Sequence, residues 1–136
     1  MRCAALHTDQ ARSEQGFTLI ELIVVLAIVA LLVSIVAPRY LRSVDNARDV
    51  SLRTSLNVMR DAIDKYAGDK GQYPPSLDEL VRQRYIRQLP VDPITGRSDS
   101  WQMLPPQEDD AMRGGVADVR SGARGQGLDG VPYGQW

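Results

Sequence analysis

The sequence predicts an α+β fold in which a long N-terminal helix packs against a small C-terminal antiparallel sheet with loops. An unbroken apolar run extends from Phe17 to Ala37, and apolar residues recur at helical spacing from Leu41 to Tyr66. Two short strand-like segments follow late in the chain, at Trp101 to Leu104 and at Gly115 to Val119. The chain has 136 residues, which is room for one ordinary domain, and the apolar run takes part of that length.

The apolar run is long enough to cross a membrane. Glu21 is its only charged residue, and Thr18 and Ser34 are its only other polar residues. As a helix at about 1.5 Å per residue, the run spans roughly 31 Å, close to the hydrocarbon thickness of a bilayer. We therefore predict a membrane span. The net charge of −1 and the charged fraction of 24% do not suggest a strongly basic protein that binds nucleic acid.

The residues before the apolar run do not form an ordinary signal peptide. A secretory signal places a small-residue cleavage site after its apolar core, whereas here a polar segment of mixed charge ends at Gly16, just before the apolar run. The only cysteine and the only histidine, Cys3 and His7, lie in that polar segment. Residues 17–136 therefore contain no thiolate or imidazole for a metal site or a nucleophile–base pair, and we do not expect an enzyme.

The segment EQGFTLIELIVVLAIVALL, residues 14–32, resembles the type III signal of the type IV pilin and pseudopilin superfamily. The matching positions are Gly16, Phe17, Glu21 and Pro38. The resemblance implies that a prepilin peptidase cleaves between Gly16 and Phe17 and methylates the new N-terminus at Phe17. The leader ends in Glu-Gln-Gly, where the family commonly has a basic residue, which leaves the efficiency of cleavage open.

The resemblance also implies a domain order and a location. It divides the chain into a leader peptide (1–16), a transmembrane and polymerisation helix (17–37), an amphipathic stalk helix (38–67) and a small periplasmic head (68–136). Arg2 and Arg12 before the span are balanced by Arg39 and Arg42 after it, so charge does not orient the chain. The resemblance implies a single-pass protein of the bacterial inner membrane, with a cytoplasmic leader and a head that joins a periplasmic filament.

Two residues of the predicted span have alternative interpretations. Because a carboxylate in hydrocarbon costs at least about 2.5 kcal/mol, Glu21 either reaches the headgroups or pairs with the Phe17 amine of a neighbouring subunit during assembly. Pro38 removes one backbone hydrogen bond near Ser34, which predicts a kink at the membrane surface. The same weak point would let the helix stretch while the fibre packs, and the two interpretations are compatible.

The predicted stalk is amphipathic. Its apolar residues are expected to seat the head's own sheet; they are Leu41, Val44, Leu52, Leu56, Met59, Ile63 and Tyr66. Its charged residues are expected to form mainly a solvated face, with ion pairs Asp49/Arg53 and Asp61/Lys65. We expect this helix to continue to about Ala67 and to end at Gly68 or Gly71.

The next segment, residues 71–96, predicts a short helix bracketed by prolines. Ser76 and Glu79 have the spacing of a capping box that opens a helix from Leu77 to Arg84. With the stalk, this segment resembles the major pseudopilin of type II secretion, the protein G family; the matching residues are Tyr73-Pro74, Leu77, Leu80, Leu89-Pro90-Val91-Asp92-Pro93 and Gly96.

That resemblance implies a structural subunit of a homopolymeric pseudopilus that drives protein export across the outer membrane. The implied partners are the lipid bilayer, the inner-membrane assembly platform, minor pseudopilins and the secretin, and no nucleic acid is expected. The alternative is a type IV pilin or minor pilin for adhesion, DNA uptake or motility. The head lacks the cysteine pair with which many pilins staple their C-terminal loop, which favours the pseudopilin.

The last loop resembles the calcium site of the protein G family. The positions that carry over are Ser121 and Asp129, with Asp118 a weaker candidate, and oxygen ligands of this kind suit calcium. The loop from Ser121 to Trp136 holds one acidic residue, however, where the family typically has at least two. The alternative is a plain tight bend at Asp129-Gly130.

Overall fold

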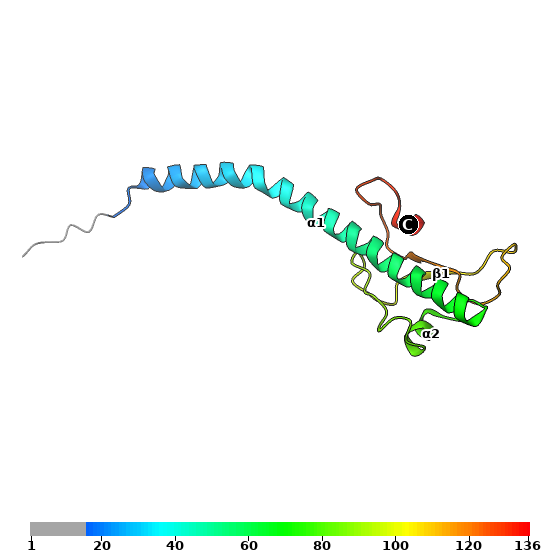
Figure 1. Ribbon diagram of the computed structural model, residues 1–136. Helices are drawn as coiled ribbons and strands as arrows, with labels where there is room; N and C mark the ends of the chain where they lie inside the picture. The colour runs from blue at the N-terminus through cyan, green and yellow to red at the C-terminus, as the bar shows by residue number, and fades with distance from the viewer. Residues whose placement is uncertain (1–15) are drawn as a thin grey trace, which may run out of the picture. The chain divides into compact units, whose positions relative to one another are not determined.

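The computed structural model describes residues 16–136, and the predicted leader, Gly16 apart, lies outside the described residues (Figure 1). The elements in order are the helices α1 (Leu19–Lys70) and α2 (Leu77–Arg82), the strands β1 (Trp101–Leu104) and β2 (Asp118–Ser121), and the 3-10 helix η1 (Tyr133–Gln135). Of the described residues, 16–39 belong to one compact unit and 40–136 to a second, and α1 contributes to both. The predicted α+β fold is confirmed.

In the first unit, Thr18 starts α1. Its hydroxyl oxygen accepts the N–H of Glu21 at 3.3 Å, and its carbonyl accepts the N–H of Leu22 at 3.2 Å. These bonds satisfy amide groups that a helix N-terminus otherwise leaves free. Glu21 lies in the first turn, where a negative charge complements the helix dipole.

The α1 residues of the first unit form a wholly exposed apolar surface. Every large apolar side chain from 19 to 36 is exposed, and among the described residues α1 is the one helix long and apolar enough to cross a membrane. The hydroxyl of Ser34 donates to the carbonyl of Ala30 at 2.8 Å, so its polar group is satisfied within the helix. Pro38 lies inside α1, and the boundary between the two units follows Arg39. The kink predicted at Pro38 stays a prediction.

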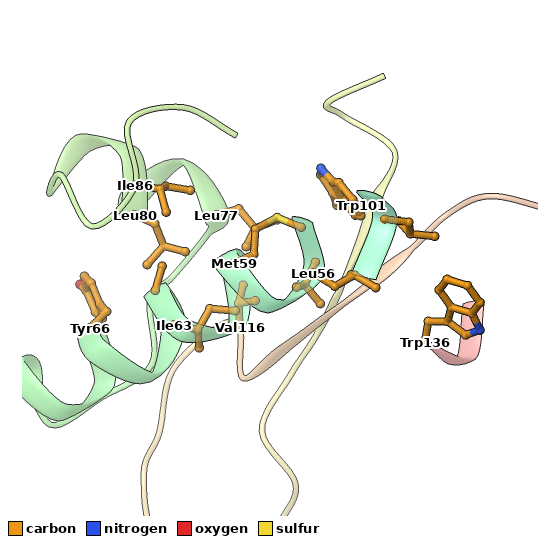
Figure 2. Close-up of a cluster of buried hydrophobic side chains, with 13 residues drawn as sticks. Leu56, Met59, Ile63, Tyr66, Leu77, Leu80, Ile86, Trp101, Val116 and Trp136 are labelled. Atoms are coloured by element: carbon orange, nitrogen blue, oxygen red, sulfur yellow. The ribbon is translucent and has the colours of Figure 1, made fainter. Parts of the chain in front are cut away.

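In the second unit, one face of α1 carries the hydrophobic core. Its buried apolar residues are Leu52, Leu56, Met59, Ala62, Ile63, Tyr66 and Ala67. Figure 2 shows Met59 and Ile63 beside side chains from the α2 region and the later chain, including Leu80 and Val116. The predicted apolar stripe is therefore confirmed from Leu52 onward, whereas Leu41 is exposed and Val44 only half-buried; the first buried residue of α1 is Asp49.

Of the two glycines predicted to end α1, Gly71 does so, and the helix continues to Lys70 and not only to about Ala67. Gly71 has a φ of 70°, and its N–H donates to the carbonyl of Ala67 at 2.9 Å. A residue without a Cβ adopts this left-handed conformation without steric strain. Gly68 stays inside the helix, which extends to Lys70.

The capping box predicted for α2 is wrong. Ser76 precedes the helix in extended backbone, but its side chain makes no capping hydrogen bond. The Glu79 carboxylate instead contacts Arg82 at 2.5 Å and accepts from the Gln83 side chain at 2.9 Å. The acidic side chain is thus engaged by residues ahead of it and does not turn back to Ser76.

α2 ends at Arg82, two residues before the predicted end. Arg84 has a φ of 63°, and its N–H donates to the Val81 carbonyl at 3.1 Å. The Tyr85 N–H donates to the Leu80 carbonyl at 2.9 Å. This pair of bonds is a Schellman cap, with an arginine at the position where glycine is usual.

The sheet has two antiparallel strands, β1 and β2, in which Trp101 opposes Ser121 and Leu104 opposes Asp118. β1 has its predicted bounds. β2 runs from Asp118 to Ser121 and not, as predicted, from Gly115 to Val119. The chain before Asp118 also bonds to another segment, since the Val116 N–H donates to the Pro74 carbonyl at 2.9 Å.

Candidate functional site

The bond between Gly16 and Phe17 lies in irregular, exposed backbone just before α1. A Cβ placed on Gly16 would have no heavy atom within 4 Å, and the Phe17 side chain is 86% exposed. A peptidase must reach an uncovered peptide, and this exposed bond outside regular secondary structure meets that requirement. The proposed cleavage and methylation positions therefore lie together at the start of the exposed apolar helix.

Glu21 lies one helical turn after Phe17, on the exposed surface of α1. Within residues 16–136 its carboxylate forms no ion pair. Thr18 and Glu21 also have the spacing of a helix-start motif, of which the structure shows one half: the backbone N–H of Glu21 donates to the Thr18 hydroxyl. A carboxylate needed only for that local motif would not have to enter a subunit interface, so the two roles require separate tests.

The second candidate site is the C-terminal segment, which we define as residues 122–136. Ser121 precedes it and is buried; its hydroxyl donates to Asp92 at 2.5 Å and accepts the N–H of Ala123 at 3.0 Å. Asp129 contacts the guanidinium of Arg53 at 2.5 Å. The two predicted calcium ligands therefore have different partners.

Asp118, the weaker candidate ligand, also has a cationic partner, because it accepts from Nε of Arg60 at 2.7 Å. Within residues 16–136, no three Asp, Glu, His or Cys side chains gather where they could share a metal ion. Calcium needs six to eight oxygen ligands. The arrangement of Ser121, Asp129 and Asp118 does not fit a calcium ion.

The alternative interpretation of this loop, a tight bend, is confirmed. The N–H of Gly130 donates to the carbonyl of Gly127 at 3.0 Å, and Gly130 has a φ of 79°. The Val131 N–H donates to the Asp129 carboxylate at 2.9 Å, which holds the bend from inside.

Asp92 organises a loop whose role sequence reasoning missed. Its Oδ1 accepts the N–H groups of Ile94 at 2.8 Å and Thr95 at 3.3 Å, while Oδ2 accepts from Ser121. The carboxylate is fully buried, and all its hydrogen bonds come from neutral donors. The local signal for this role is the Asp-Pro pair at Asp92-Pro93, because this pair favours the start of a turn.

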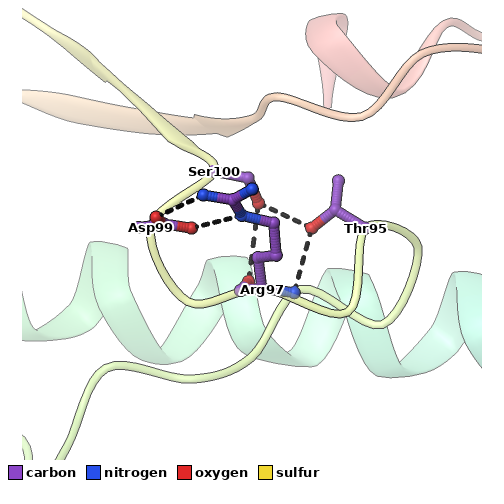
Figure 3. A network of polar contacts seen from close by, with 4 residues as sticks. All are labelled: Thr95, Arg97, Asp99 and Ser100. Carbon is purple, nitrogen blue, oxygen red and sulfur yellow. Dashed lines mark hydrogen bonds and ion pairs between the residues drawn. The ribbon is translucent and has the colours of Figure 1, made fainter.

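A surface network continues this loop (Figure 3). The Arg97 guanidinium donates to both carboxylate oxygens of Asp99, at 2.7 Å and 2.6 Å, and the hydroxyls of Thr95 and Ser100 lie 2.6 Å apart. The hydrogen bond from Arg97 is the main cause that lowers the pKa of Asp99. Because this pair is exposed, its contribution to stability is small.

Asp49 contradicts the prediction of a solvated charge paired with Arg53. It is only 7% exposed, and its carboxylate accepts the N–H of Leu128 at 2.8 Å and the hydroxyl of Tyr133 at 3.0 Å. Arg53 turns instead to Asp129. Of the two predicted helix pairs, only Asp61 with Lys65 is present, at 3.6 Å.

Comparisons with known proteins match both the N-terminal motif and most of the length of the chain. Residues 11–37 match a family model described as "Prokaryotic N-terminal methylation motif". A protein of Klebsiella michiganensis named "Type II secretion system core protein G" is 31% identical over 137 residues, which cover 89% of this chain and 88% of the relative. The chain belongs to the type II secretion system core protein G family. It is a pseudopilin of the type IV pilin superfamily.

Other relatives extend and qualify the assignment of this pseudopilin. The core protein G of Vibrio cholerae is 31% identical over 143 residues, covering 92% of the pseudopilin chain and 93% of the relative. "Competence protein ComGC" of Halalkalibacterium halodurans is 27% identical over 73 residues, which cover 54% of the pseudopilin chain and 72% of the relative. No solved structure gives a significant match.

Proposed function

We propose that this chain is the main structural subunit of a type II secretion pseudopilus, with an assembly role and no catalytic one. The observation that carries the proposal is the exposed Gly16–Phe17 bond, directly followed by an apolar helical surface with no protein covering in the described chain. A surface of this kind needs lipid or other copies of the same helix around it.

The proposed sequence of events begins in the inner membrane. The chain inserts once, with residues 1–16 in the cytoplasm and the head in the periplasm. A prepilin peptidase cleaves after Gly16 and methylates Phe17. The apolar helix then leaves the lipid and enters a bundle of identical helices, because the same surface is satisfied by lipid chains and by neighbouring subunits.

Glu21 is proposed to align the copies in this bundle. Its carboxylate on one subunit lies beside the Phe17 amine of the next, so each charge compensates the burial cost of the other. The filament grows on an inner-membrane assembly platform, minor pseudopilins join it, and it pushes exported proteins through an outer-membrane secretin. A cytoplasmic ATPase that contacts other parts of the machine supplies the energy.

The processing step is tested by mass spectrometry of the chain extracted from membranes of secreting cells. The proposal expects a mature chain that begins with a methylated Phe17. A chain that keeps its first sixteen residues while secretion continues would contradict it. Deletion of the gene should then abolish the release of secreted proteins and leave surface fibres intact, and secretion should return with the wild-type gene.

A second candidate function, a subunit of a DNA-uptake filament, is favoured by the match to the competence protein. The same deletion separates the two functions. Loss of transformation with normal secretion would support the competence filament, whereas loss of secretion with normal transformation supports the pseudopilus. The greater identity and coverage of the core protein G relatives make the pseudopilus the better supported function.

A further inference from the structure

The C-terminal segment contains no α-helix and no strand. Its own order comes from the bend at residues 127–130, an isolated bridge between Gln126 and Pro132, and the single turn η1. The indole of Trp136 lies over Gly127, where a Cβ would overlap the ring. So few internal bonds would not keep fifteen residues ordered, because ordering each residue costs about 1–2 kcal/mol of backbone entropy. Burial of Trp136 in the core, packing of η1 against β2, and polar contacts with α1 contribute the rest.

Three charged side chains of α1 make those contacts. Asp49 accepts from Leu128 and Tyr133, as described above. The guanidinium of Arg53 binds Asp129, and its Cζ lies 4.0 Å from the ring centroid of Trp136, a cation–π distance. Positions 49 and 53 are one helical turn apart and therefore share a face of α1.

Arg60, two turns further along the same face, has the most partners. Its Nε donates to Asp118 at 2.7 Å, and its Nη2 donates to the carbonyls of Val119 at 3.0 Å and Trp136 at 2.8 Å. One planar guanidinium thus joins β2 to the last residue of the C-terminal segment. Lysine could not reproduce this geometry, since it lacks the fixed fork of donors.

Both arginines line a groove of about 330 Å³ between α1 and the C-terminal segment. Their carboxylate partners are Asp129 and Asp118, two of the three oxygen donors carried over from the family's calcium loop. A divalent cation that bound these carboxylates would stand beside two fixed positive charges and would have to displace both. The hydroxyl of the third donor, Ser121, is bonded to Asp92.

We infer that Arg53 and Arg60 fasten the C-terminal segment to α1 in place of a divalent cation, so that the head of this pseudopilin folds independently of calcium. The guanidinium groups supply the positive charge and the directional bonds that a bound cation would otherwise give to the same carboxylates and carbonyls.

The first test is thermal unfolding of the full chain in detergent micelles, followed by near-ultraviolet circular dichroism of Trp101 and Trp136. Calcium at a few millimolar and excess chelator should give melting temperatures within about 1 °C of each other. A ligand present well above its Kd stabilises the fold by an amount that shifts Tm by roughly 5 °C or more. A rise of that size on adding calcium would overturn the inference.

The second test removes the guanidinium groups one at a time. Arg60→Gln should lower Tm by roughly 10 °C and Arg53→Gln by roughly 5 °C, since Arg60 loses three hydrogen bonds and Arg53 loses an ion pair and a ring contact. The matched control is Lys65→Gln, which removes one charge from an exposed pair on the same helix and should change Tm by about 1 °C. Equal effects of all three substitutions would show that Arg53 and Arg60 do not fasten the C-terminal segment to α1.

A local measurement keeps the test decisive if Arg60→Gln does not fold. Hydrogen exchange of the Arg53→Gln chain should rise roughly 10-fold or more at amides of residues 122–136 and stay unchanged in α2, which Arg53 does not contact. Arg53→Lys should restore part of the protection through charge alone. Unchanged exchange in residues 122–136 of Arg53→Gln would show that the segment is held by something else.

Discussion

The hydroxyl of Ser121, at the end of β2, donates a 2.5 Å hydrogen bond to the carboxylate of Asp92, and both residues are fully buried. The bond connects the proline-rich loop after α2 to the sheet edge that leads into the C-terminal segment. Because the other oxygen of Asp92 is occupied by two backbone amides, this carboxylate is the junction of the two loops.

Ser121→Ala should lower the free energy of unfolding by about 1–3 kcal/mol, because it leaves Oδ2 of Asp92 buried without its partner. Urea unfolding of the full chain in micelles measures this change. Ser98→Ala is the control, since Ser98 is exposed, and it should stay within about 0.5 kcal/mol of the wild type. If the two substitutions cost the same, the bond does not hold the loops together.

Elements determined by local sequence were predictable. Strand-favouring residues are enough to predict β1 with its observed bounds, and a glycine is enough to predict the end of α1, because each acts over a few neighbours. The start of β2 was not predictable in the same way. Gly115 lies against Pro75, where a Cβ would overlap the Pro75 carbonyl, and no local pattern reveals a contact between segments forty residues apart.

The partners of the charged residues of α1 were also not predictable from local sequence. Asp49 and Arg53 have the spacing of a helix ion pair, yet each binds a partner more than seventy residues away. A buried amide and hydroxyl require an acceptor more strongly than an exposed arginine requires a carboxylate. The processing positions are different, since Gly16, Phe17 and Glu21 belong to one short motif that is recognisable without any tertiary contact.

Tyr133 predicts how the stability of the head depends on pH. Burial, and then the hydrogen bond it donates to Asp49, raise the pKa of Tyr133 above its ordinary value of 10.0. The folded chain therefore holds this proton more tightly than the unfolded chain does, so the stabilisation is complete below about pH 10 and is lost as pH rises through the folded-state pKa.

Tyr133→Phe should accordingly lower stability at pH 8, by about 1–2 kcal/mol for the lost hydrogen bond, and weaken the further loss above pH 10. Urea midpoints at pH 8 and at about pH 10.5 measure both effects. Tyr85→Phe is the comparison, because the hydrogen bond from Tyr85 to Asp69 also raises the pKa of Tyr85. If the Tyr133→Phe chain loses as much stability between pH 8 and about pH 10.5 as the wild type does, a group other than Tyr133 causes that loss.

Arg84 predicts a stabilising substitution. Its φ of 63° is unfavourable for any side chain with a Cβ, and its side chain is exposed. Arg84→Gly should therefore raise the free energy of unfolding by about 0.5–1 kcal/mol, the strain relieved less the extra entropy of the unfolded chain. Arg84→Ala keeps the strain and should be close to neutral. A glycine variant less stable than the alanine variant would show that the left-handed backbone at position 84 is not a source of strain.

Glu21 carries the sharpest prediction about assembly. Glu21→Leu should leave the chain in the membrane, because it removes a charge that hydrocarbon disfavours by at least about 2.5 kcal/mol. Filaments should nevertheless be lost, since a Phe17 amine buried without its carboxylate partner destabilises the interface by about 3–5 kcal/mol. Membrane fractionation and cross-linking through cysteines engineered into the span measure the two effects separately.

Thr18→Ala is the matched control for Glu21, because it removes the bond from the Glu21 N–H that starts α1 and keeps the carboxylate. If Glu21 serves as the charge partner of a neighbouring subunit, Thr18→Ala chains still give cross-linked ladders while Glu21→Leu and Glu21→Gln chains give none. If Glu21 serves only the helix start, Glu21→Gln keeps the ladders, because glutamine can take the same place in the motif, and Thr18→Ala weakens them. Normal filaments from Glu21→Leu would exclude the alignment role altogether, since no other charged side chain lies in the described helix from Leu19 to Pro38.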